Sequence, residues 1–106
     1  MPLAVCAISA LAIGGQVAAA GASAKSVTLK NIAFSPSRLS VTRGTTLTFR
    51  FRDDTTTHNV TSSGAKRFKT ISNRSTGSVE RTFAKAGVYR YTCTLHPGMT
   101  GQITVR

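Results

Sequence analysis

Apolar and polar residues alternate with a period of two along much of the chain after residue 24. The alternation is strictest over residues 46–52, where Leu47, Phe49 and Phe51 are separated by single polar residues. Side chains of a β-strand point alternately to its two faces, so this pattern is typical of a strand with one buried face. We therefore expect a strand here, with the three large apolar side chains directed into the core.

Shorter stretches of the same kind predict further strands at residues 26–30, 39–41, 58–61, 79–83, 87–93 and 102–105. Residues 34–38 contain a proline and are expected to form a connection. The polar and basic stretch 62–77 predicts a long loop or an edge strand, held to the core by Phe68 and Ile71. Apolar residues after Lys25 do not recur at helical spacing over successive turns. The pattern as a whole predicts an all-β fold, an antiparallel Greek-key β-sandwich.

The first 24 residues contain no charged side chain, run apolar over residues 2–13 and end in small residues. This composition predicts an export signal peptide at residues 1–24 and one domain at residues 25–106. An uncleaved membrane anchor is the alternative, although a spanning helix needs about 20 mostly apolar residues and the apolar run is broken at residues 14–16. The expected location is therefore exported, either periplasmic or extracellular at the cell envelope.

Basic residues far outnumber acidic ones. Fourteen Lys and Arg oppose only Asp53, Asp54 and Glu80, which gives a formal charge of +11. Such a charge steers a protein toward acidic partners, so we expect an acidic redox-partner protein or an anionic cell envelope. A simply soluble surface is the alternative. An exported location argues against nucleic acid as the partner, and we expect a monomer.

Three side chains that bind soft metals lie at intervals of three near the C-terminus: Cys93, His96 and Met99. A thiolate with imidazoles and a weak thioether suits copper, which alternates between two oxidation states, whereas zinc gains little from methionine. The spacing therefore predicts a mononuclear copper site. The alternative for Cys93, the only cysteine after residue 24, is a buried structural thiol.

The backbone around these residues favours a close return of the chain. Tyr89, Tyr91 and Cys93 fall on one face of the predicted strand at residues 87–93, so the thiol is expected to arrive facing inward. Pro97 and Gly98 have the residue order of a type II turn, which would direct Met99 back toward Cys93.

The segment with Cys93, His96 and Met99 resembles the copper-binding loop of the cupredoxins, and its spacing is most similar to the amicyanin branch. The family has a further histidine ligand far upstream, usually followed by asparagine, and His58-Asn59 matches this pattern. The resemblance implies a cupredoxin-like fold with one copper ion, Cu(II) or Cu(I). His58, Cys93 and His96 would form a trigonal set, with Met99 as a long axial contact.

The resemblance also implies roles around the ligands. Asn59 and Thr94 would tie the two ligand loops together, and the backbone N–H of Asn59 would point at the cysteine sulfur. Leu95, Pro97 and Gly98 would form a neutral patch around His96 where a partner docks. No fixed charge occurs over residues 95–100, in contrast to the basic chain around them.

The function expected from these residues is electron transfer without enzymatic activity. Copper enzymes typically hold a second metal with additional histidines, but His58 and His96 are the only two in the chain. The expected protein is thus a small exported blue copper protein that carries one electron. Two alternatives stay open at this point: a copper carrier or scavenger that uses the same residues, and a metal-free β-sandwich that serves in adhesion or assembly.

Overall fold

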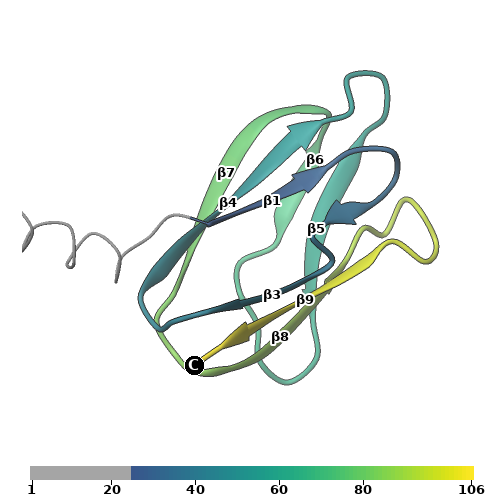
Figure 1. Cartoon of the computed structure of the whole chain (residues 1–106). Coiled ribbons are helices and arrows are strands. Elements are labelled where there is room, and N and C mark those ends of the chain that lie inside the picture. The colour runs from purple at the N-terminus through teal and green to yellow at the C-terminus, as the bar shows by residue number, and fades with distance from the viewer. Residues whose placement is uncertain (1–24) are drawn as a thin grey trace, which may run out of the picture.

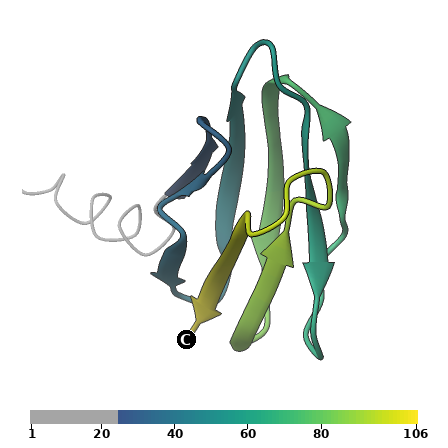
Figure 2. The ribbon, with the colours of Figure 1, turned by 90° about the vertical axis from the view of Figure 1, so that its right-hand side faces the viewer.

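A computed structural model of the protein describes residues 25–106, and the expected export signal at residues 1–24 lies outside them. In the described part, the strands form two sheets that face each other (Figures 1 and 2). The first sheet has the spatial order β2 (Phe34–Ser35), β1 (Lys25–Leu29), β4 (Thr45–Arg52) and β7 (Thr76–Phe83). The second has the order β3 (Arg38–Val41), β9 (Thr100–Val105), β8 (Gly87–Thr92), β5 (His58–Ser63) and β6 (Ile71–Arg74). The predicted all-β sandwich is confirmed.

Two strand pairs run parallel, β1 with β4 and β3 with β9. The predicted antiparallel pairing holds for the other pairs but not for these two. The connectivity explains the first case, because the chain leaves β1 and β2, crosses to the second sheet as β3 and then returns as β4. A strand that returns after such a crossover enters the first sheet in the same direction as β1.

All of the strands predicted from the alternation are present. Residues 34–38, expected as a connection, also contain the two-residue strand β2. For the polar and basic stretch 62–77, the edge strand is the correct alternative, because β6 lies at the edge of the second sheet. Ile71 is buried and Phe68 packs against the aromatic rings of Phe49 and Phe83, so both residues hold this stretch as predicted.

Aromatic rings fill the space between the sheets. Leu47, Phe49 and Phe51 all point inward from β4 and are almost completely buried. Tyr91 stands edge-on to the ring of Phe49, with 5.6 Å between the ring centroids. Its ring also covers Gly101 so closely that a Cβ atom there would lie 2.4 Å from two ring carbons. The core therefore requires glycine at position 101.

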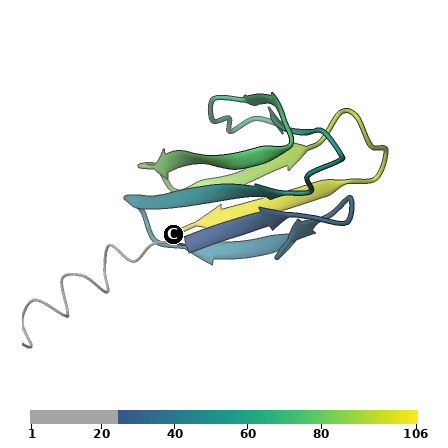
Figure 3. The ribbon, with the colours of Figure 1, turned by 90° about the horizontal axis from the view of Figure 1, so that it is seen from above.

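Three connections lie together at one end of the sandwich: the turn at residues 30–33, the loop at residues 53–57 and the loop at residues 93–99 (Figures 1 and 3). The C-terminus lies at the opposite end. The first of these connections joins β1 to β2, the second leads into β5, and the third joins β8 to β9. The fold thus brings the segments that contain the predicted ligands to one place. Within residues 25–106 there is no helix long and apolar enough to cross a membrane.

Candidate metal centre

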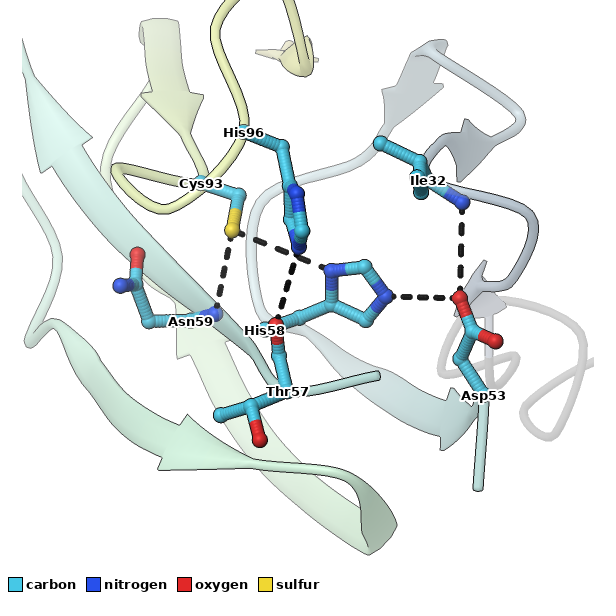
Figure 4. A network of polar contacts seen from close by, with 7 residues as sticks. All are labelled: Ile32, Asp53, Thr57, His58, Asn59, Cys93 and His96. Carbon is cyan, nitrogen blue, oxygen red and sulfur yellow. Dashed lines mark hydrogen bonds and ion pairs between the residues drawn. The ribbon is translucent and has the colours of Figure 1, made fainter. Parts of the chain in front are cut away.

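Three of the four predicted ligands converge at this end of the sandwich. One donor atom each from His58, Cys93 and His96 lies within 4.8 Å of the other two (Figure 4). His58 is fully buried and Cys93 is 1% exposed, whereas His96 is half-buried. The set therefore has two donors inside the protein and one at its surface.

His58 begins β5, directly after a tight turn. The carbonyl of Asp53 accepts a hydrogen bond from the N–H of Thr56 at 2.8 Å, which folds the loop back before the strand begins. The pairing of β5 with β6 shifts register between His58 and Val60. Such irregularities re-aim side chains. Here His58, Asn59 and Val60 are all buried, although strict alternation would expose one of them.

The loop at residues 93–99 closes on itself through backbone hydrogen bonds. The N–H of Cys93 donates to the carbonyl of Met99 at 2.9 Å, and the N–H of Met99 donates to the carbonyl of His96 at 3.1 Å. The second bond spans Pro97 and Gly98, and Gly98 has a φ of 87°. Proline followed by a residue at positive φ is the geometry of a type II turn, as the sequence predicts.

Met99 returns next to the start of its loop. Its side chain is 3% exposed and belongs to the hydrophobic core. Its carbonyl also accepts a hydrogen bond from the hydroxyl of Thr92 at 2.9 Å, so the backbone at Met99 is held from two sides. Its role as the axial ligand stays a prediction.

Asn59 ties β5 to the loop that contains Cys93. Its side-chain amide donates to the hydroxyl of Thr94 at 2.8 Å, and its side-chain oxygen accepts from the backbone N–H of Thr94 at 3.1 Å. Its own backbone N–H points at the sulfur of Cys93, 3.4 Å away. The amide also donates to Asn73 at the edge strand β6. Both contacts that the sequence predicts for Asn59 are therefore present.

Hydrogen bonds at the outer ring nitrogens orient the two imidazoles. Nε2 of His58 lies 2.9 Å from a carboxylate oxygen of Asp53, and Nε2 of His96 lies 3.1 Å from the carbonyl oxygen of Thr57. A carboxylate and a carbonyl can only accept, so Nε2 is the donor in both rings, and in a neutral imidazole this leaves the Nδ1 lone pair free. Nδ1 of His58 lies 3.9 Å from the sulfur of Cys93. The hydrogen bond from His58 lowers the pKa of Asp53, and the N–H of Ile32 acts in the same direction.

Sequence reasoning missed Asp53 and considered it only as one of the three acidic residues of the chain. A signal was present, because Asp53 is one of three acidic residues on a chain with a net charge of +11 and lies five residues before a predicted ligand. Thr57 was missed as well. Its contact with His96 is made by the backbone carbonyl, so its side chain gives no signal.

The predicted docking residues lie at the surface beside His96. Leu95 is 44% exposed, and Pro97 and Gly98 are exposed as well. Their role in docking a partner stays a prediction.

The donor set fits copper by its chemistry. One thiol and two imidazoles lie close together, and a thioether lies in the same short loop as the thiol. Thiolate and thioether select copper, and a set of two histidines and one cysteine with a weak methionine is the pattern of blue-copper sites. The residues His58, Cys93, His96 and Met99 are consistent with a type 1 copper site.

Known structures share this fold. A purple cupredoxin from Nitrosopumilus maritimus is 25% identical, with a TM-score of 0.69 over 77% of this chain and 99% of its own. An amicyanin variant in its Cu(I) form is 26% identical, with a TM-score of 0.71 over 83% of this chain and 89% of its own.

A copper-containing nitrite reductase from Thermus scotoductus SA-01 is 24% identical, with a TM-score of 0.68 over 79% of this chain and 22% of its own, and it shares the fold alone. No curated protein sequence matches the chain. The cupredoxin-like domain matches residues 3–105. With this match, the chain belongs to the cupredoxin-like family.

Proposed function

We propose that the chain is a one-electron carrier with a mononuclear type 1 copper site held by His58, Cys93, His96 and Met99. The observation that carries this proposal is the convergence of a buried thiol and two imidazoles, with donor atoms within 4.8 Å of one another. Similarity to an amicyanin in its Cu(I) form supports it. A bound copper ion would supply one-electron redox chemistry by alternating between Cu(II) and Cu(I).

The residues around the ligands favour a site that changes little between redox states. The backbone N–H of Cys93 donates to the carbonyl of Met99, and the sulfur of Cys93 accepts from the N–H of Asn59. The outer nitrogens of His58 and His96 are each held by an acceptor. Ligands fixed from outside keep their positions when the charge at the centre changes, and small rearrangement lowers the barrier to electron transfer.

We propose a carrier and not an enzyme because one site uses both histidines of the chain. No further histidine is left to hold a second metal at which a substrate could react. The half-buried His96 is the proposed exit for the electron, because His58 and Cys93 are enclosed. Leu95, Pro97 and Gly98 form the proposed neutral patch around this exit.

The proposed partner is an acidic redox protein. None of the 14 Lys and Arg side chains forms an ion pair within residues 25–106, so their charge is available for steering. Because salt screens this positive charge, rates with an anionic oxidant such as ferricyanide should fall as the salt concentration rises.

We further propose that the protein acts outside the cytoplasm, as the composition of residues 1–24 suggests.

Electron self-exchange between reduced and oxidised protein, measured by NMR line broadening, tests the carrier function without a partner. We expect fast exchange that slows when Leu95→Asp places a charge in the neutral patch. Val88→Asp is the matched control, because Val88 is 41% exposed, similar to Leu95, but lies near the start of β8 and outside the loop of Cys93.

Copper exchange with a chelator separates the carrier from a copper scavenger. An electron carrier keeps its copper during many rounds of oxidation and reduction. Slow self-exchange together with rapid loss of Cu(I) to a chelator would contradict the proposal and favour copper carriage by the same residues. Equal slowing by the Leu95 and Val88 variants would contradict the neutral patch as the exit.

A further inference from the structure

One carboxylate lies directly behind a predicted ligand. Asp53 and His58 form the only contact between a carboxylate and a basic side chain within residues 25–106, with 2.9 Å between the carboxylate oxygen and Nε2. The His58 side chain is fully buried and that of Asp53 is 18% exposed. On a chain with a net charge of +11, none of the 14 Lys and Arg takes this carboxylate. It is directed instead at a histidine (Figure 4).

The two histidines therefore have unequal acceptors. His58 donates to a charged carboxylate, whereas His96 donates to the neutral carbonyl of Thr57. A hydrogen bond to a charged group is about twice as strong as one to a neutral group. It also draws the proton away from the ring, which makes the opposite nitrogen, Nδ1, a stronger electron donor. His58 is thus the better donor of the two.

The carboxylate of Asp53 is itself held by the turn between β1 and β2. Lys30 and Ala33 exchange two backbone hydrogen bonds of 3.1 Å across Asn31 and Ile32, which have φ values of 56° and 55°. The N–H of Ile32 points at the same carboxylate oxygen, at a long distance of 3.5 Å. A β-branched residue at positive φ is a conformational outlier, and such outliers gather at functional sites. The chain here keeps an unfavourable turn beside the carboxylate.

We propose that Asp53 is a positioning residue of the copper site, which holds His58 with Nδ1 free and lowers the reduction potential by favouring Cu(II) over Cu(I). This inference rests on the proposed copper-binding function. The physical reason is that a stronger imidazole donor stabilises the higher charge of Cu(II) more than that of Cu(I). Mutation of an outer group of this kind typically changes metal affinity 10–100-fold.

The test compares Asp53→Asn with Asp54→Asn in the copper-loaded protein. Both variants remove one negative charge from the same loop, but Asp54 is exposed and its carboxylate makes no hydrogen bond to any residue of 25–106. For Asp53→Asn we expect the ratio of Cu(II) to Cu(I) affinity to fall about tenfold, which is a rise in midpoint potential of about 59 mV for one electron. Asp53→Glu, which keeps the charge, should restore part of the shift, and Asp54→Asn should change the potential little.

A second measurement needs neither copper nor a variant. In the metal-free protein at mildly alkaline pH, ¹⁵N NMR of the histidine rings should show His58 with hydrogen on Nε2 and none on Nδ1. Hydrogen on Nδ1 would overturn the role of Asp53. Equal potentials for the Asp53→Asn and Asp54→Asn proteins would also overturn it while leaving the copper site intact. A protein that takes up no copper would contradict the proposed function, and with it the effect on the potential.

Discussion

Asn59 and Thr94 hold each other by two hydrogen bonds of 2.8 and 3.1 Å, one in each direction. Asn59 follows His58 on β5, and Thr94 follows Cys93 in the loop after β8. The residue after one predicted ligand is therefore hydrogen-bonded to the residue after the other. This pair holds the two segments that contain the buried donors against each other, although its two residues are 35 positions apart along the chain.

Asn59→Ala should lower the free energy of unfolding of the metal-free protein by about 2–4 kcal/mol, because several hydrogen bonds worth about 0.5–1.5 kcal/mol each are lost. Thr94→Ala removes only the hydroxyl and should cost about 1 kcal/mol. Thr94→Ser keeps the hydroxyl and serves as the control. Denaturant unfolding measures all three variants, and equal losses for Asn59→Ala and Thr94→Ala would contradict the central position of Asn59.

Met99→Gln tests the axial ligand. An oxygen donor stabilises Cu(II) more than a thioether does, so the variant should keep its copper while its midpoint potential falls, by about 59 mV for each tenfold change in relative affinity. Met99→Leu keeps a similar volume without a donor atom and should shift the potential upward. Voltammetry measures both changes. An unchanged potential in the glutamine variant would refute Met99 as the axial ligand.

Ile32→Gly should stabilise the metal-free protein by about 0.5–1 kcal/mol, because glycine adopts positive φ without the cost of about 1–2 kcal/mol that other residues incur. Asparagine followed by glycine is also the most favoured pair for this kind of two-residue turn. Ile32→Ala retains a Cβ and is the control, for which no gain is expected. A thermal unfolding series measures the effect, and a gain equal for both variants would show that backbone strain is not its cause.

Tyr91 should make the protein sensitive to alkali. Burial raises the pKa of its phenol above the usual range, and its hydroxyl has no hydrogen-bond partner within residues 25–106. The unfolded chain releases this proton near pH 10 and the folded state only at higher pH, so the stabilising effect is complete below about pH 10 and is lost as the pH rises above it. The loss from this one group amounts to at most about 1.4 kcal/mol per pH unit.

Tyr91→Phe should therefore flatten the fall in stability above about pH 10 and leave the stability at neutral pH equal or higher, since an unpaired buried hydroxyl is removed. Tyr89→Phe is the control. The hydroxyl of Tyr89 donates to the carbonyl of Lys85 at 2.8 Å, so its loss should cost stability at neutral pH, in contrast to the loss of the unpaired Tyr91 hydroxyl. Identical alkaline slopes in the Tyr91→Phe and wild-type proteins would contradict this explanation.

The alternation of apolar residues predicts which face of a strand is buried, and the structure agrees for β4, where Leu47, Phe49 and Phe51 are all inside. Alternation does not predict which strand pairs with β4, or whether the two strands run parallel or antiparallel. The parallel pairing of β4 with β1 depends on the excursion of β3 into the other sheet, and this long-range choice leaves no local pattern in the sequence.

The sequence predicts those residues of the candidate site that lie close together along the chain or that match the ligand pattern of a known family. Cys93, His96 and Met99 lie in one short loop, and His58 follows from the resemblance to the cupredoxins. Asp53 was not predictable in this way, because its contact with His58 depends on how the loop of residues 53–57 turns back. The long hydrogen bond from Ile32 depends on a separate turn, 21 residues away in the chain.

A visible absorption spectrum of the protein with one equivalent of Cu(II), followed by ascorbate and then an oxidant, tests the central claim most directly. A type 1 site predicts an intense thiolate-to-copper band that bleaches with ascorbate and returns with the oxidant, and that is absent from Cys93→Ser. A protein that remains colourless with Cu(II) would contradict the claim.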